Sequence, residues 1–262
     1  MNALTRSFNK RCSGEYRAIG FLKAKGAFVR LSNDVLHVFS LKNFRNEPLC
    51  TVEFGIIPLC DSIPIYLEAG KYELSGFDAE WHRDWRYDPK SNDSIELCVD
   101  TLIHAMNDKL IPLYTMCEDC KSTLPELMKL EELFDINRIK WLELIGGCNR
   151  ASPWQERSMF DSTKFYMALK SCDYDYAEKY LRFHISYCQT ELELMERPES
   201  TKQPEIVKIR ITENLNVWTD YLKRLTSGDY TFFDNLLLQN EAQTKSWLLD
   251  RYPAISKLFK SA

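Results

Sequence analysis

The sequence predicts an α+β fold. We expect an N-terminal helix packed on a small antiparallel sheet of three to five strands, followed by an all-helical C-terminal half built from helical hairpins. Two observations support this prediction. Short β-rich runs separated by turn residues fill positions 21–60, as in an antiparallel meander. From position 91 onward, apolar residues recur every three or four positions, which is typical of amphipathic helices.

The first predicted element is a helix over residues 2–19. Leu4, Phe8 and Cys12 recur at four-residue intervals and therefore share one face of a helix. Gly20 is placed to end the helix.

The N-terminal segment is strongly basic. Residues 1–30 hold seven basic side chains against Glu15 alone, although the whole chain has 34 basic and 38 acidic residues and a net charge of −4. This segment forms either a solvated polar face or a docking surface for an acidic partner or for the protein's own acidic half. The basic residues are Arg6, Lys10, Arg11, Arg17, Lys23, Lys25 and Arg30.

Three strands are expected to follow, over residues 28–31, 35–41 and 49–57, and the run from 72 to 77 predicts a fourth. Because side chains alternate between the two faces of a strand, His37 points outward if Leu36 and Val38 face the core.

A long apolar stripe from Ile95 to Leu113 predicts the next helix. Pro112 should kink or end it, because proline lacks the N–H that a helix interior needs. Two shorter helices, near 124–134 and 138–144, are expected before a break at Gly146-Gly147.

The last third predicts helical hairpins, with a turn at Cys172-Asp173 and helices over 204–225 and 231–249. Leu169–Tyr174 is echoed by Leu225–Tyr230, a pattern similar to helix-pair repeats of the tetratricopeptide kind, although two copies do not establish a repeat array. We therefore divide the chain into a sheet region (1–90), helices packing on the sheet (91–145) and a helical-hairpin region (150–262).

Composition limits the class of protein. With 45% hydrophobic and 27% charged residues, the chain is neither collagen-like nor disordered. The net charge argues against a nucleic-acid binder. No signal-peptide pattern begins the sequence, and no apolar stretch is long enough to cross a bilayer. We expect a cytoplasmic protein that binds another protein, and neither nucleic acid nor a membrane.

No combination of residues in the sequence identifies a reaction. Cys117–Cys120 is the only C-x-x-C among nine cysteines, and it lacks the second pair of ligands that a zinc site needs. His184 and Cys188 fit a buried helix stripe as well as a metal pair. Phosphate-loop, dinucleotide and hydrolase motifs are missing. We therefore expect no enzyme activity, no metal and no cofactor.

The most unusual segment combines two Trp, a Tyr and two Arg within seven positions. These residue types dominate protein-binding hot spots. Two alternatives remain open: Trp81 and Trp85 close the sheet beneath a helix, or His82, Asp84 and Arg86 belong to a dispersed catalytic site. The partner-binding candidates are Trp81, His82, Arg83, Asp84, Trp85, Arg86 and Tyr87.

Two segments resemble a widespread, mostly bacterial domain family of unknown function. Gly20–Arg30 is similar to the family's G-F-x-K-x-G-x-x-F-x-R opening. Cys50–Ile56 resembles its F-T-V-N-L-G-I strand, with Cys50 replacing the aromatic residue and Glu53 replacing Asn. The resemblance covers about residues 4–115. It implies a helix followed by a strand meander, no known catalysis and, from toxin–immunity relatives, a binding role by analogy.

The expected function is a non-catalytic protein-binding module, of the immunity or antitoxin type, that occludes a partner's site. A third reading is a helical peptide-binding scaffold, whose groove would be lined by Tyr176, Tyr180 and Tyr187.

Overall fold

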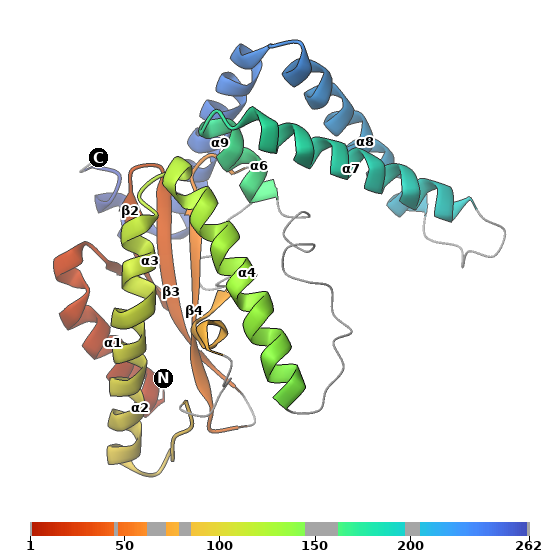
Figure 1. The fold of residues 1–262 in the computed structure, drawn as a ribbon. Coiled ribbons are helices and arrows are strands. Elements are labelled where there is room, and N and C mark those ends of the chain that lie inside the picture. Colours follow the sequence, from red (N-terminus) through yellow and green to blue (C-terminus); the bar gives the residue numbers. More distant parts are fainter. Residues whose placement is uncertain are drawn as a thin grey trace.

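The computed structural model describes residues 2–44, 47–61, 72–78, 85–144, 162–196 and 205–260. Its centre is a five-stranded antiparallel sheet whose strands follow one another in chain order. Helices cover both faces of the sheet, and further helices project away from it (Figure 1). The predicted α+β architecture with an all-helical second half is confirmed. The strands are β1 (Leu22–Ala24), β2 (Ala27–Ser32), β3 (Val35–Asn43), β4 (Cys50–Pro58) and β5 (Tyr72–Glu73).

Helix α1 (Ala3–Glu15) begins after Asn2, whose Oδ1 accepts a hydrogen bond from the backbone N of Thr5 at 2.8 Å. This bond satisfies one of the free N–H groups of the first turn. A short 3-10 helix, η1 (Arg17–Ile19), follows and ends at Gly20, whose φ of 92° is readily adopted by glycine. The apolar face predicted for this helix is buried: Leu4, Phe8 and Cys12.

The predicted strands correspond to β2, β3 and β4, and β1 is an addition of three residues. The predicted fourth strand has only two residues, because the chain turns at once into a 3-10 helix, η2 (Leu74–Phe77). A Cβ atom on Gly76 would lie 2.4 Å from the ring of Phe134. This close packing needs a glycine, and it seats η2 against the helix that carries Phe134.

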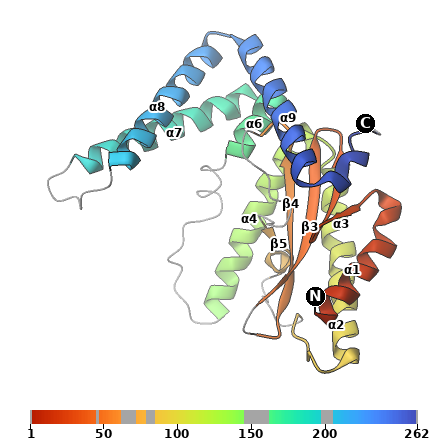
Figure 2. The same cartoon turned by 180° about the vertical axis from the view of Figure 1, so that it is seen from behind.

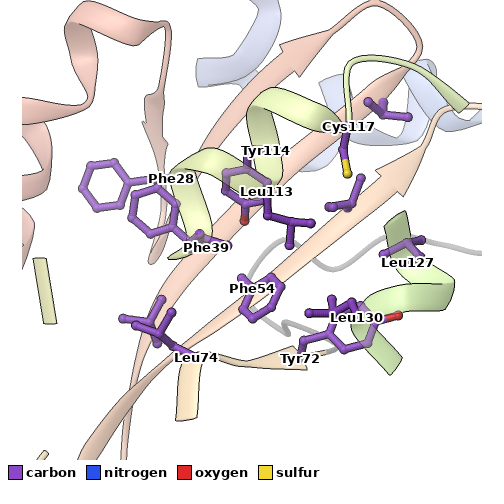
Figure 3. Packing of buried hydrophobic residues seen from close by; sticks show 14 of the residues in the cluster. Phe28, Phe39, Phe54, Tyr72, Leu74, Leu113, Tyr114, Cys117, Leu127 and Leu130 are labelled. Carbon is purple, nitrogen blue, oxygen red and sulfur yellow. The ribbon is translucent and has the colours of Figure 1, made fainter. Parts of the chain in front are cut away.

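One face of the sheet carries the larger hydrophobic core (Figure 3). Phe28, Phe39 and Phe54 stand on three adjacent strands, and the rings of Phe28 and Phe39 stack with centroids 5.0 Å apart. Helices α1, α2 (Asn92–Ala105), α3 (Ile111–Met116) and α4 (Cys120–Leu144) contribute to this core.

The opposite face of the sheet is covered by the C-terminal part of the chain, α9 (Tyr230–Arg251) and the 3-10 helix η4 (Pro253–Lys257). A second, smaller core forms there from Ala24, Ala27, Val29, Leu36, Val38, Leu59, Leu248, Tyr252 and Ile255. Since the sheet is covered on both faces, β3 is buried along most of its length.

Cover on both faces of the sheet corrects the prediction for His37, which is fully buried and does not point outward. Leu36 and Val38 face the smaller core, as the prediction required, but His37 faces the larger one. The Nε2–H of His37 donates to the backbone O of Cys117 at 2.6 Å. The Nη2 of Arg30 donates to its Nδ1 at 3.0 Å. The prediction assumed that only one face of the sheet was covered.

The helix predicted from the stripe between residues 95 and 113 is formed by α2 and α3, joined by a single π-helical turn, η3 (Met106–Leu110). Pro112 lies in the first turn of α3, where a missing N–H costs least. The helix therefore does not end at Pro112 but continues to Met116. The wider turn immediately before the proline ring is the local irregularity of this helix.

The two helices predicted over 124–134 and 138–144 are one continuous helix, α4. Asn137 lies between them, and asparagine disfavours a helix interior because its side chain competes for backbone groups. Here its Nδ2 donates to the backbone O of Gly76 at 3.1 Å and of Phe77 at 2.9 Å. The side chain thus bonds to η2 and not to its own helix. The break predicted at Gly146-Gly147 lies outside the described residues.

The C-terminal half confirms the predicted helical hairpins. It comprises α6 (Ser162–Lys170), α7 (Tyr174–Met195), α8 (Glu205–Thr226) and α9. Helices α7 and α8 pack side by side and project away from the sheet (Figures 1 and 2). We call this pair the arm. Helix α9 then returns to the sheet and reaches its second face.

Buried polar contacts join the C-terminal helices to the sheet region. Lys164 of α6 forms an ion pair with Glu131 of α4, and both side chains are at most 2% exposed. The hydroxyl of Tyr72 donates to the same carboxylate at 2.8 Å. On α9, the Nδ2 of Asn240 donates to the backbone O of Cys60 at 3.0 Å. The sheet and the helical-hairpin region therefore share both apolar and polar contacts.

Candidate functional site

The last three residues of the predicted contact segment pair with the start of β4. Trp81, His82, Arg83 and Asp84 lie outside the described residues. The backbone O of Trp85 accepts a hydrogen bond from the N of Cys50 at 3.3 Å, and the N of Tyr87 donates to the O of Pro48 at 3.1 Å. Arg86 and Leu49 form an antiparallel bridge between these bonds. The segment is thereby held against the edge of the sheet region.

Trp85 belongs to the larger core, with 6% of its surface exposed. It packs near Cys50 and Cys98, whose Sγ atoms lie 3.5 Å apart, and its backbone O accepts from the thiol of Cys50 at 3.5 Å. Trp85 therefore closes the core, which is one of the alternatives considered for this segment. Its side chain offers little surface to a partner.

Arg86 and Tyr87 are placed differently. Arg86 is exposed and Tyr87 is half-buried. Burial, together with the nearby Cys50 and Cys98, raises the pKa of Tyr87, so its hydroxyl stays protonated and able to donate. Tyr87 lines a shallow hollow of about 490 Å³ together with Asn2, Asn43, Phe44, Glu47, Pro48 and Pro89.

The second contact candidate, the basic N-terminal helix, adjoins this hollow. A second hollow, of about 310 Å³, lies along α1 and is lined by Ala3, Arg6, Ser7, Lys10, Arg11 and Glu96. Asn2 lines the first hollow and Ala3 the second, so the two meet at the start of α1. Segments far apart in the sequence thus meet at one end of the molecule.

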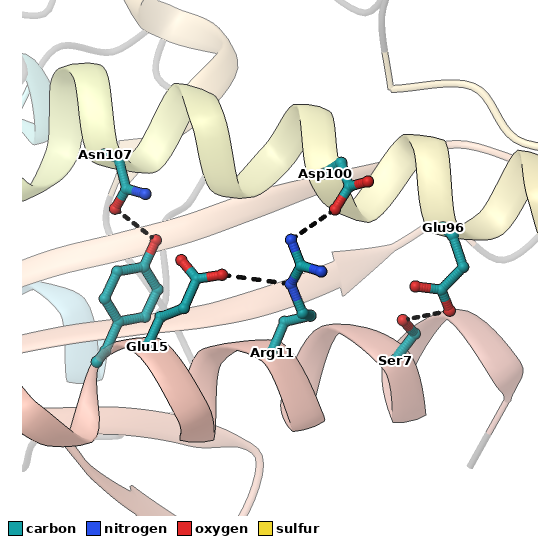
Figure 4. Close-up of polar contacts among 7 residues, drawn as sticks. Ser7, Arg11, Glu15, Glu96, Asp100 and Asn107 are labelled. Carbon is teal, nitrogen blue, oxygen red and sulfur yellow. Dashed lines mark hydrogen bonds and ion pairs between the residues drawn. The ribbon is translucent and has the colours of Figure 1, made fainter.

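Part of the basic helix is neutralised by the protein itself (Figure 4). The Nη2 of Arg11 lies 2.7 Å from Oδ1 of Asp100 on α2, and its Nε lies 3.3 Å from Oε1 of Glu15. The hydroxyl of Ser7 donates to Glu96 at 2.7 Å. This edge of α1 docks against acidic residues of α2, which is one of the two docking roles considered from the sequence.

The remaining basic residues divide into two groups. Arg30 lies inward, where its guanidinium bonds to His37 and lies 5.1 Å from the centroid of the Phe21 ring. The exposed group consists of Arg6, Lys10, Arg17, Lys23 and Lys25, and within the part of the chain that the structure describes none of them forms an ion pair. Arg6 and Lys10 line the hollow along α1 and leave an uncompensated positive surface there, whereas Arg17 lies in η1, beyond the other end of α1.

The catalytic alternative rests on residues that the structure places only in part. His82 and Asp84 lie outside the described residues, and Arg86 is exposed. His37 is held neutral, because burial and the adjacent Arg30 lower its pKa to about 3. His184 packs against the rings of Tyr180 and Trp218, with centroids 4.3 and 5.5 Å away.

The cysteine candidates are buried. In the C-x-x-C, Cys117 is enclosed by the core, and the Sγ of Cys120 lies 3.9 Å from that of Cys60. Cys188 is buried on α7 one turn from His184. Among the described residues, no group of three or more metal-ligating side chains is gathered.

The tyrosines of the proposed peptide groove do not share one surface. Tyr180 is 1% exposed and stacks on Phe165 with centroids 5.2 Å apart, whereas Tyr187 is 40% exposed. Tyr176 is half-buried. A concave surface lined by all three tyrosines is therefore not formed.

The residues that surround Tyr87 could not be recognised from the sequence. Asn43 and Pro48 lie between the strands predicted over 35–41 and 49–57, and Asn2 stands before the first helix, but residues in such connections carry no signal for which distant segment they meet. The bridge between Leu49 and Arg86, which brings these segments together, depends on tertiary packing.

No protein-family model matches this chain, and no significant match is found among curated proteins or solved structures. Within the described residues, no helix combines the length and apolar character needed to span a membrane.

Proposed function

We propose that this chain is a non-catalytic, cytoplasmic protein-binding module that acts by covering a site on its partner, as bacterial immunity and antitoxin proteins do. The observation that carries the proposal is the meeting of two candidate surfaces, Tyr87 with its hollow and the start of the basic helix α1, at one end of the molecule. Shallow hollows rimmed by an aromatic residue and arginines suit a protein surface better than a small ligand, which needs a deep enclosed pocket.

Charge supports an acidic patch on the partner. Arg6 and Lys10 border the hollow on α1, and they are exposed. Opposite charges across an interface accelerate association and favour the correct partner. Binding should therefore weaken as ionic strength rises, because salt screens exposed charges over about 10 Å at 0.1 M.

The experiment is affinity capture of the tagged full chain from a lysate of its own host, with mass spectrometry of the retained proteins. We expect one partner in stoichiometric amount, and loss of that partner when Arg6→Glu/Lys10→Glu is used as bait. The matched control is Lys121→Glu/Lys140→Glu, which makes the same charge change on α4 and should retain the partner. If well-folded wild-type protein retains no partner, the proposal is wrong.

Occlusion requires a second readout. Once the partner is identified, its own activity should fall in proportion to the amount of this chain added, until one equivalent abolishes it. A partner that is retained but keeps its full activity at saturation would contradict occlusion while leaving the binding role intact.

A further inference from the structure

Helix α8 has one face without a partner in the described structure. Of its 22 residues only Leu225 is buried. The face toward α7 is half-buried and includes Leu215, Trp218 and Leu222, and Trp218 contacts the ring of Tyr180 with centroids 5.9 Å apart. Because the arm projects away from the sheet (Figures 1 and 2), the opposite face of α8 is open to a partner.

The open face carries apolar residues at helical spacing. Ile206, Ile209 and Val217 are 60%, 49% and 44% exposed, and Arg210 and Glu213 lie between them and are also exposed. Residues three, four, seven and eleven apart share one stripe of an α-helix. We call these five residues the outer stripe of α8.

The charges of the outer stripe are free to pair outside the chain. Within the described residues, the ion pairs of α8 involve Lys208 and Arg224, and neither Arg210 nor Glu213 takes part in one. An exposed pair of opposite charges, flanked on both sides by exposed apolar residues, is the composition expected of a helix–helix contact.

The outer stripe is complementary to itself. Consider two α8 helices that run antiparallel and are related by a two-fold axis passing between Ile211 and Thr212. Each residue then faces the residue of the second copy whose number, added to its own, gives 423. Ile206 then faces Val217 of the second copy, and Arg210 faces Glu213 of the second copy. Two-fold symmetry repeats both contacts, as an isologous interface requires.

We propose that two copies of this chain associate through the outer stripe of α8, in an antiparallel, two-fold arrangement. The charge pattern favours a second copy over an acidic or basic partner, because a partner of one sign would pair with one charge of the stripe and repel the other. A single helix pair covers less than the about 800 Å² per partner of a standard interface. The dimer therefore dissociates on dilution.

The test is sedimentation velocity of the full chain, from low micromolar to several hundred micromolar concentration. Wild-type protein should move from the mass of one chain to that of two. Arg210→Glu places Glu opposite Glu at both symmetry-related positions, and Glu213→Arg places Arg opposite Arg. Each variant should raise the dissociation constant at least about tenfold.

Recombining the variants separates direct contact from an effect on folding. An equimolar mixture of Arg210→Glu with Glu213→Arg should form a heterodimer, because both facing pairs are then attractive. The double variant Arg210→Glu/Glu213→Arg should recover the homodimer. Val217→Ser, which leaves all charges in place, should weaken the dimer through its apolar contact. Lys179→Glu occupies the same position of α7 that Arg210 occupies in α8 and serves as the matched control.

Several outcomes would overturn the proposal. Wild-type protein that stays monomeric at the highest concentration would do so. So would a dimer that is equally tight in Arg210→Glu. The proposal would also fail if the two single variants formed no heterodimer when mixed, although their circular dichroism and thermal melting match the wild type.

Discussion

Tyr174 and Tyr230 stack face to face, with ring centroids 4.3 Å apart and planes inclined by 17°. Tyr174 is the first residue of α7, and Tyr230 is the first residue of α9. They also end the two echoing sequence segments, Leu169–Tyr174 and Leu225–Tyr230. The echo therefore marks equivalent turns, one before α7 and one before α9, and the stack places these two turns in direct contact.

We expect this stack to couple the two turns energetically. Tyr174→Ala, Tyr230→Ala and the double variant, compared by urea unfolding, should give a coupling free energy of about 0.5–1 kcal/mol. The same cycle between Tyr174 and Tyr187, which lies farther along α7, should give a coupling close to zero. Equal coupling in the two cycles would mean that the stack contributes nothing specific.

His37 should make the protein less stable in acid. Its pKa is lowered to about 3 in the folded chain by burial and by Arg30, whereas in the unfolded chain it is about 6.5. Between these values the unfolded state binds a proton that the folded state does not, so stability falls as pH falls from about 6.5 toward 3. The loss approaches 1.4 kcal/mol per pH unit.

The measurement is the free energy of unfolding between pH 7 and pH 4, for wild type and for His37→Gln. The variant lacks the titrating group and should show a shallower dependence on pH, whatever its absolute stability. Parallel curves for the two proteins would exclude His37 as the group responsible.

The ion pair between Lys164 and Glu131 should be costly to break. Lys164→Met leaves the carboxylate of Glu131 buried without its cation and should lower the free energy of unfolding by about 3–5 kcal/mol. The control is Lys129→Met, on α4 itself, which breaks the exposed pair of Lys129 with Glu126 and should cost less than about 1 kcal/mol. Similar losses in both variants would show that Lys164 is not in a dry environment.

Trp85 and Tyr87 should respond differently to truncation. Trp85→Ala removes a core side chain and should cost about 3–5 kcal/mol, whereas Tyr87→Ala, at the rim of a hollow, should cost about 1 kcal/mol or less. Thermal melting of the two variants checks this. A mild effect of Trp85→Ala would place the indole outside the core and return it to the contact candidates.

The elements whose signal is local could be predicted from the sequence. The four-residue spacing of Leu4, Phe8 and Cys12 correctly predicts α1, and β-rich runs between turns correctly predict β2, β3 and β4. Helical periodicity correctly predicts α7, α8 and α9. Each of these patterns lies within one element and its flanking turns, so no distant segment is needed to interpret it.

The errors come from contacts between distant segments. His37 is buried because its own face of the sheet is covered by α3 and the turn after it: its ring stacks on Tyr114 and its Nε2 donates to the backbone O of Cys117, 80 positions away. Asn137 continues a helix because its side chain bonds to η2. The meeting of Tyr87 with the start of α1 depends in the same way on tertiary packing.

The most direct test of the binding role compares three baits in one capture experiment: wild type, Arg86→Ala/Tyr87→Ala, and Lys121→Glu/Lys140→Glu. Arg86 is exposed and Tyr87 is half-buried against the larger core, so their truncation should lower the free energy of unfolding by about 1 kcal/mol or less and leave the protein folded. We predict that wild type and the α4 control retain the same stoichiometric partner and that Arg86→Ala/Tyr87→Ala retains less than a tenth as much. Equal retention by all three baits, or no partner on folded wild type, would contradict the account.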